Sequence, residues 1–312
     1  MGITNILLLV LGYVLLLFST KLVNGGGISI MRKGPTSDAQ ERIFSWFALS
    51  LMPFLSIAIS GGVLGLGNMV FTAALTAGVL QLLLIYGMLG ITGTYRLAGN
   101  ALRDLVLLIV CTNYTWSKGH PASTISRGMG LFLCVLAVAF TVWMLPYFMG
   151  KNRKLQRRPD TDFVPAIVFT LVGLALAGLG GVLLMNNTAA LTHALNIEQG
   201  VLGVAVIGVG LVLPEYVRVA RKYWMNTQKP VSMHLTLATG NLGLLLMIGL
   251  SAVISPIIVT FAGAYLLLAC VVAIIVFGIL FYVGGEVGKI KAILFLAGFA
   301  LVFVLLMKFS LH

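Results

Sequence analysis

Residues 200–256 decide the fold of this chain, and they read GVLGVAVIGVGLVLPEYVRVARKYWMNTQKPVSMHLTLATGNLGLLLMIGLSAVISP. An apolar stretch runs into Pro214 and Glu215, a basic turn follows, and a second apolar stretch opens with Thr239-Gly240-Asn241. A carboxylate inside a membrane span is costly unless it is paired, so Glu215 is expected to be functional. Proline breaks a helix and frees backbone carbonyls, which is tolerated at membrane depth where they line a cavity. The stretch therefore predicts half of a membrane-transport site.

The composition supports a membrane protein and excludes several other classes. The chain has 312 residues, of which 60% are hydrophobic and only 9% charged, and its formal net charge is +12. In a soluble protein that charge would suggest nucleic-acid binding. Here it is better explained by membrane topology, because basic residues collect in cytoplasmic loops. The cysteines and histidines show no ligand spacing, so no metal site or cofactor is expected. No nucleophile–base pair is found either, which argues against an enzyme.

Ten apolar runs are long enough to be transmembrane helices. They are expected at 3–23, 43–63, 69–92, 102–117, 128–149, 163–185, 198–219, 232–254, 257–282 and 290–309. The predicted fold class is therefore an all-α integral membrane protein with ten transmembrane helices.

The basic residues divide unevenly between the two sides of this helix map. Of the 20 lysines and arginines, 17 fall on one side, and three, Lys118, Arg127 and Lys308, fall on the other. Because basic loops stay in the cytoplasm, the richer side is predicted to be cytoplasmic. It includes the cluster at 151–158, which is also expected to touch anionic lipid. Both termini are then expected outside, in a multi-pass protein of the plasma (inner) membrane.

The two halves of the chain show a weak internal repeat. The matched positions are Gly12 with Gly173, Pro53 with Pro214 and, after one inserted residue, Gly78 with Gly240 and Gly87 with Gly249. Since five helices per half is an odd number, the second half is expected to be inserted upside down. The predicted organisation is a first repeat at 1–150, a basic linker at 151–162 and a second repeat at 163–312. Inverted repeats place a substrate site near the midplane, where interrupted helices of the two halves meet.

At these positions the chain resembles the calcium/cation antiporter superfamily, of the sodium–calcium exchanger type. Each repeat of that family carries G-T-S-L-P-E and, about two dozen residues later, G-S-N-x-x-N. The second half of this chain reads GLVLPE at 210–215 and ATGNLG at 238–243, and the first half reads LSLMPF at 49–54 and TAGVLQ at 76–81. The resemblance implies ten helices in two inverted five-helix repeats and cation exchange.

The departures from the family pattern concern the ion ligands. The family binds calcium or sodium with one glutamate from each repeat, helped by serine, threonine and asparagine oxygens. Here Phe54 stands where the first repeat of the family has its glutamate. The serines of the two repeats are replaced by Leu51 and Val212. The first asparagine of each repeat is replaced by Gly78 and Gly240, and the second one by Gln81 and Gly243. Calcium prefers six to eight oxygens, several of them from carboxylates. One carboxylate with a few neutral oxygens is a poor calcium cage.

The first functional hypothesis is therefore a divergent antiporter of a monovalent cation or a proton, working by alternating access. Glu215 would carry the ion or proton, unless it simply pairs with Arg218 one helical turn later. Pro53 and Pro214 would interrupt the helices that carry the site. Neutral oxygens are expected from a set of polar residues in both repeats, namely Ser50, Thr76, Gln81, Thr239 and Asn241.

Two other hypotheses follow from the same residues. A cavity stripped of acids and bordered by Arg218 and Arg221 would accept an anionic substrate, such as a lipid-linked phosphate. A third possibility is a membrane subunit or scaffold that kept the fold and lost the site.

Overall fold

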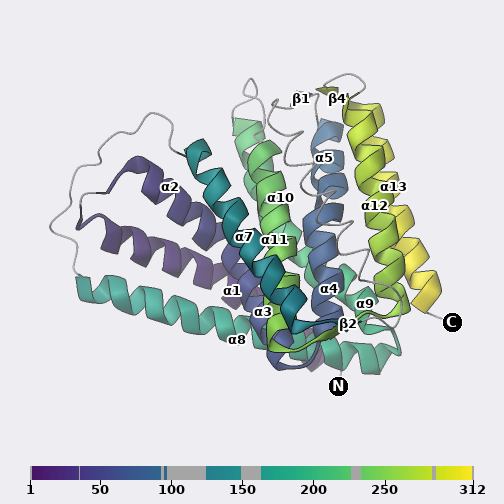
Figure 1. Ribbon diagram of the computed structural model, residues 1–312, viewed down its shortest axis with the longest axis horizontal. Helices are drawn as coiled ribbons and strands as arrows, with labels where there is room; N and C mark the ends of the chain where they lie inside the picture. The colour runs from purple at the N-terminus through teal and green to yellow at the C-terminus, as the bar shows by residue number, and fades with distance from the viewer. Residues whose placement is uncertain are drawn as a thin grey trace.

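The computed structural model describes residues 2–34, 36–92, 95–96, 124–148, 163–225, 233–282 and 286–310. These residues are almost entirely helical, with two short β-ribbons (Figure 1). The first half contains α1 (Gly2–Met31), α2 (Asp38–Trp46), η1 (Phe47–Leu51), α3 (Met52–Val63), α4 (Gly67–Leu75), η2 (Thr76–Leu80), α5 (Gln81–Thr92), β1 (Tyr95–Arg96), β2 (Thr124–Ile125) and α7 (Arg127–Phe148), where η marks a π-helical segment. The second half contains α8 (Phe163–Leu195), α9 (Gln199–Leu202), η3 (Gly203–Gly208), α10 (Val209–Met225), α11 (Met233–Ile254), β3 (Ile257–Ile258), α12 (Phe261–Tyr282), β4 (Glu286–Val287) and α13 (Lys289–Ser310).

The predicted all-helical membrane class is confirmed. Within the described ranges, eight helical segments are long and apolar enough to cross a membrane. Apolar side chains such as Leu171 and Leu179 of α8 face outward, whereas polar ones such as Thr188 are buried. This distribution is typical of a chain whose solvent is lipid. The fourth expected span, at 102–117, and the linker at 151–162 lie outside the described residues.

Two helices extend well beyond their predicted ends. Helix α1 continues to Met31 through three consecutive glycines at 25–27, and α8 continues to Leu195 past the polar Asn187. A Cβ at Gly26 would come within 2.6 Å of the carbonyl oxygen of Ala166, so these glycines allow the two helices to touch. Close packing with a neighbour therefore outweighs the low helix propensity of glycine.

The helices are not interrupted at the two prolines, contrary to the prediction. Pro214 lies inside α10, and Pro53 lies in the first turn of α3. A π-helical segment precedes each of them, η3 before Pro214 and η1 before Pro53. Proline has no N–H, so it cannot donate a backbone hydrogen bond within the helix. A wide i→i+5 turn upstream and a position near the start of a helix both reduce the number of backbone hydrogen bonds lost in this way. The backbone thus widens locally where a break was expected.

The contact between α1 and α8 joins the two halves along most of both helices (Figure 1). Glycines make it possible, because a Cβ at Gly12 would lie 3.0 Å from the Gly180 carbonyl oxygen and one at Gly180 would lie 2.9 Å from that of Gly12. Near the other end, Gly173 packs on Val23 in the same way. Small residues at such a crossing let helix backbones approach closely in a membrane.

Several contacts recur when the two halves exchange places. Strand β1 pairs with β4, with Tyr95 opposite Val287, and β2 pairs with β3, with Ile125 opposite Ile257. Strands β1 and β3 are 162 residues apart in the sequence, and so are β2 and β4. The β1 and β4 labels lie at one end of the molecule, and β2 lies at the opposite end (Figure 1).

Helix packing shows the same correspondence. Gly87 of α5 lies against Ala292 and Leu296 of α13, and Gly249 of α11 lies against Gly130 and Cys134 of α7. The two sets of positions again differ by 162 residues. The contacts between the halves are therefore related in pairs.

Candidate functional site

A small cavity lies where η1 and α3 of the first half meet α10 and α11 of the second. It has a volume of about 20 Å³, which is room for a single water molecule or one dehydrated ion. It is lined by Tyr13, Leu16 and Leu17 of α1, by Leu49, Ser50, Pro53 and Phe54, by Gly210, Leu211, Pro214 and Glu215, and by Thr239. Among the predicted site residues, the structure brings together Ser50, Pro53, Pro214, Glu215 and Thr239.

Glu215 brings the acidic group to this cavity. It sits on α10 directly after Pro214 and is only 6% exposed. The side chain of Tyr86 on α5 is also fully buried. A carboxylate held in an apolar interior is costly, and that cost is offset by polar neighbours, a bound cation or a bound proton.

Two hydroxyl groups line the same cavity from opposite halves of the chain. Ser50 belongs to η1, whose wide turn brings it to the cavity wall, and Thr239 belongs to α11. Both side chains are buried. A carboxylate and two hydroxyl oxygens can bind a small cation together, and the carboxylate alone can bind a proton.

Trp46, which the sequence reasoning missed, holds Thr239 in place. Its indole Nε1–H donates a hydrogen bond of 3.0 Å to the Thr239 Oγ1, and both side chains are buried. Trp46 ends α2 and directly precedes η1, so it lies one helical turn before Ser50. A tryptophan one turn before a candidate ligand was a signal in the sequence, but its partner lies 193 residues away.

Phe54 adds an aromatic ring to the part of the cavity wall that the first half supplies. Its ring packs against Gly243 of α11, where a Cβ would lie 3.3 Å from the ring carbons. Phe54 is almost fully buried, so its ring occupies part of the cavity wall. The two halves therefore contribute differently to the cavity, Phe54 from the first half and Glu215 from the second.

The other predicted oxygens are buried but are not among the described residues that line the cavity. Gln81 donates from Nε2 to the backbone carbonyl of Thr236 at 3.4 Å, and it fills the space beside Gly240. The Thr76 hydroxyl donates to the carbonyl of Thr72 at 2.9 Å, a common use of threonine in membrane helices. Asn241 is fully buried on α11.

Arg218 follows Glu215 by one turn of α10. Its side chain lies outside the described residues, so the predicted pairing with Glu215 stays a prediction. Arg221 is exposed.

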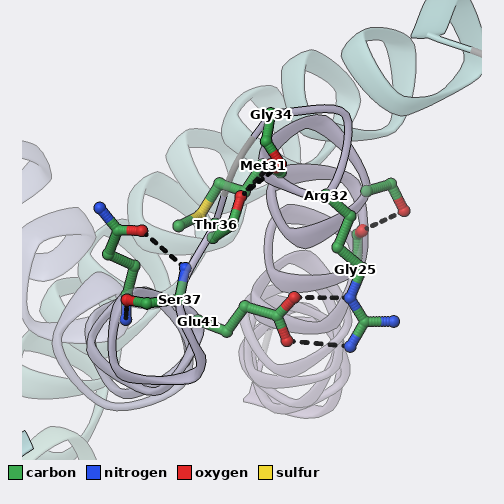
Figure 2. Close-up of polar contacts among 9 residues, drawn as sticks. Gly25, Met31, Arg32, Gly34, Thr36, Ser37 and Glu41 are labelled. Atoms are coloured by element: carbon green, nitrogen blue, oxygen red, sulfur yellow. Dashed lines mark hydrogen bonds and ion pairs between the residues drawn. The ribbon is translucent and has the colours of Figure 1, made fainter. Parts of the chain in front are cut away.

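A second buried acid, Glu41, lies at the junction of α1 and α2, and Figure 2 shows it facing Arg32. Two hydrogen bonds join them, Nε to Oε1 at 2.5 Å and Nη2 to Oε2 at 2.9 Å. This bond to the carboxylate raises the pKa of Arg32. The turn between them is closed by the Thr36 hydroxyl, which donates to the Met31 carbonyl, and by a capping box between Ser37 and Gln40. Glu41 is thus neutralised by a structural ion pair.

The comparisons with known proteins agree on the fold. No family model matches the chain. A protein named "Putative antiporter CaxA" from Alkalimonas amylolytica is 25% identical over 147 residues, which is 47% of this chain and 46% of that protein. A solved structure of the sodium–calcium exchanger NCX_Mj superposes with a TM-score of 0.57 at 16% identity, covering 97% of this chain and 99% of that one. The H⁺/Ca²⁺ exchanger CAX superposes with a TM-score of 0.67 at 13% identity, covering 98% and 86%. These relatives are transporters and not enzymes, and the predicted resemblance is confirmed at the level of the fold.

Proposed function

We propose that this chain, which has the fold of the calcium/cation antiporters, exchanges a monovalent cation or a proton across a membrane by alternating access. Glu215 is the carrier carboxylate in this proposal. It binds the cation or the proton in the cavity, and the two occupants compete for the same oxygens. The observation that carries the proposal is the burial of Glu215 in a cavity formed by both halves of the chain.

The donor set of the cavity favours a monovalent ion over calcium. One carboxylate, the hydroxyls of Ser50 and Thr239, and the ring of Phe54 line it. Calcium takes six to eight oxygens and usually several carboxylates, whereas a proton needs only one. The volume of about 20 Å³ also suits an ion that has shed most of its water.

The proposed architecture is a pair of inverted five-helix repeats at 1–150 and 163–312, joined by the basic linker at 151–162. Its support comes from contacts that recur when the halves exchange places, namely the ribbons β1–β4 and β2–β3 and the glycine contacts of α5 and α11. A site at the interface of two such repeats can open alternately to either side, because one repeat rocks against the other.

The experiment that tests the function is cation-driven proton movement in liposomes that contain the purified protein. Sodium, potassium and calcium are each applied across a pH gradient, with wild type, Glu215→Gln and Glu198→Gln compared. Glu198→Gln is a matched control, because the substitution also removes one carboxylate, here from a half-buried position at the start of α9.

The expected result is flux with sodium or potassium in wild type and in Glu198→Gln, and its loss in Glu215→Gln. All three proteins should elute as single, folded species. Calcium-driven flux that exceeds the monovalent signal would contradict the proposed selectivity. Absence of any flux from folded wild type would contradict the antiporter itself.

A further inference from the structure

Trp46 connects the two halves of the chain at the edge of the cavity without lining it. Its indole N–H donates to the Thr239 Oγ1 at 3.0 Å, and the side chain is 6% exposed. Tryptophan Nε1 is only a donor, so the threonine oxygen must be the acceptor. The direction of this hydrogen bond is therefore settled by chemistry.

This hydrogen bond restricts what the Thr239 hydroxyl offers to the cavity. A hydroxyl oxygen has two lone pairs and one hydrogen, and the indole takes one lone pair. At most one lone pair of this oxygen can then face a cation, and the hydroxyl hydrogen has to be directed at a different acceptor. The directions open to the Thr239 hydroxyl, which lines the cavity with Glu215 and Ser50, are thus restricted from outside the cavity.

The same residue also adjoins the segment that carries Ser50. Trp46 is the last residue of α2, and the π-helical segment η1 begins at the next residue. Its side chain is held on α11 while its backbone leads into η1, so it links the positions of both hydroxyl groups. A side chain that ties two ligand-bearing segments together favours one geometry of the site.

We propose that Trp46 is a positioning residue that sets the cation affinity of the Glu215 cavity through Thr239. The inference rests on the proposed function, because it concerns the same site. It predicts that loss of the indole N–H weakens cation binding more than it slows turnover, since Trp46 does not touch the ion.

The test is Trp46→Phe, which keeps a buried aromatic ring and removes the donor. Flux in liposomes is measured against cation concentration and against pH, to separate KM from the maximal rate. The variant is made in wild type, in Thr239→Val and in Thr239→Ser. Trp143→Phe is the matched control, since Trp143 is nearly half exposed on α7.

We expect Trp46→Phe to raise KM for the cation about three- to tenfold, the effect of losing one ordinary hydrogen bond, with the maximal rate within about twofold of wild type. The same change should shift KM in Thr239→Ser, which keeps the hydroxyl, and should have no further effect in Thr239→Val. Trp143→Phe should leave KM unchanged. Stabilisation of the protein against heat by the cation should weaken in parallel with KM.

Two results would overturn the inference. One is an unchanged KM in Trp46→Phe while wild type transports normally, which would leave the proposed function intact. The other is an equal KM shift in Thr239→Val, which would show that Trp46 acts on packing alone. Wild type that neither transports nor is stabilised by any cation would instead contradict the proposed function, and this inference with it.

Discussion

Glu41 and Glu215 show two ways of keeping an acid inside an apolar protein. Among the described residues they are the two acidic side chains that are buried. Glu41 is neutralised by the guanidinium of Arg32 in a bidentate pair. Glu215 instead lines a cavity with two hydroxyl groups, where the proposed cation or proton would bind. A permanent partner suits a structural role, and an exchangeable one suits transport.

We therefore expect Glu41→Gln to destabilise the protein without changing the ion preference. Loss of charged hydrogen bonds to a largely buried acid should cost about 1–3 kcal/mol, measured as a lower Tm in detergent. The pKa of Arg32 is higher in the folded protein than in the unfolded one. The stabilisation that the charged arginine contributes to the fold is therefore complete below the unfolded pKa. It is lost only as pH rises through the raised value, so the arginine adds no pH dependence near neutrality.

The control for that variant is Asp38→Asn. Asp38 pairs with Arg42 one turn later at 2.9 Å, but both side chains are more than a third exposed. An exposed pair of this kind should contribute no more than about 0.5 kcal/mol. An equal loss of Tm in the two variants would contradict the structural importance of the Arg32–Glu41 pair.

At the scale of the elements, the three π-helical segments found in the described ranges contain or precede predicted site residues. Segment η1 contains Ser50 and precedes Pro53, η2 begins at Thr76 and ends before Gln81, and η3 precedes Pro214. In η3 the carbonyl of Val206 accepts from the backbone N–H of Val209 and also from the hydroxyl of Tyr13 on α1. The extra residue in such a turn rotates everything beyond it by about 100° around the helix axis.

Helices α1 and α8 offer a test of their close approach. A Cβ at Gly180 would lie 2.9 Å from the Gly12 carbonyl oxygen and 3.0 Å from the backbone nitrogen of Leu16. Because both atoms belong to the backbone, Gly180→Ala should push the helices apart and cost about 1–3 kcal/mol, seen as a lower Tm. Gly178→Ala, two residues earlier, meets nothing within 4 Å and should be neutral or stabilising by up to about 1 kcal/mol. Similar Tm values for the two variants would show that the helices do not pack this tightly.

At the scale of the whole molecule, the uneven distribution of basic residues predicts the orientation of the chain in the membrane. We expect the linker at 151–162 to face the cytoplasm and both termini to lie outside. Single cysteines can test this in a background where Cys111, Cys134 and Cys270 are replaced. A membrane-impermeant maleimide should label His312→Cys in intact cells and should label Asn152→Cys only after the cells are permeabilised. The reverse labelling pattern would show that the orientation is inverted.

The sequence was sufficient for the class of the protein and for its principal candidate residue. The apolar runs placed nine helical stretches of the described residues near their observed positions, because hydrophobicity along a helix is a local property. The same reasoning placed Glu215 inside the membrane, and the structure buries it. The resemblance to the cation antiporters likewise rested on short local motifs.

Only the tertiary structure decided which oxygens gather around Glu215. Ser50 and Thr239 line the cavity, whereas Gln81 is bound to a backbone carbonyl beside Gly240. Spacing along the chain cannot separate these residues, because each π turn changes the direction in which all later side chains point. The partners of Thr239 and Glu41 depend on which helices pack together. Those contacts join distant residues, such as Trp46 and Thr239, whose pairing leaves no periodic signal in the sequence.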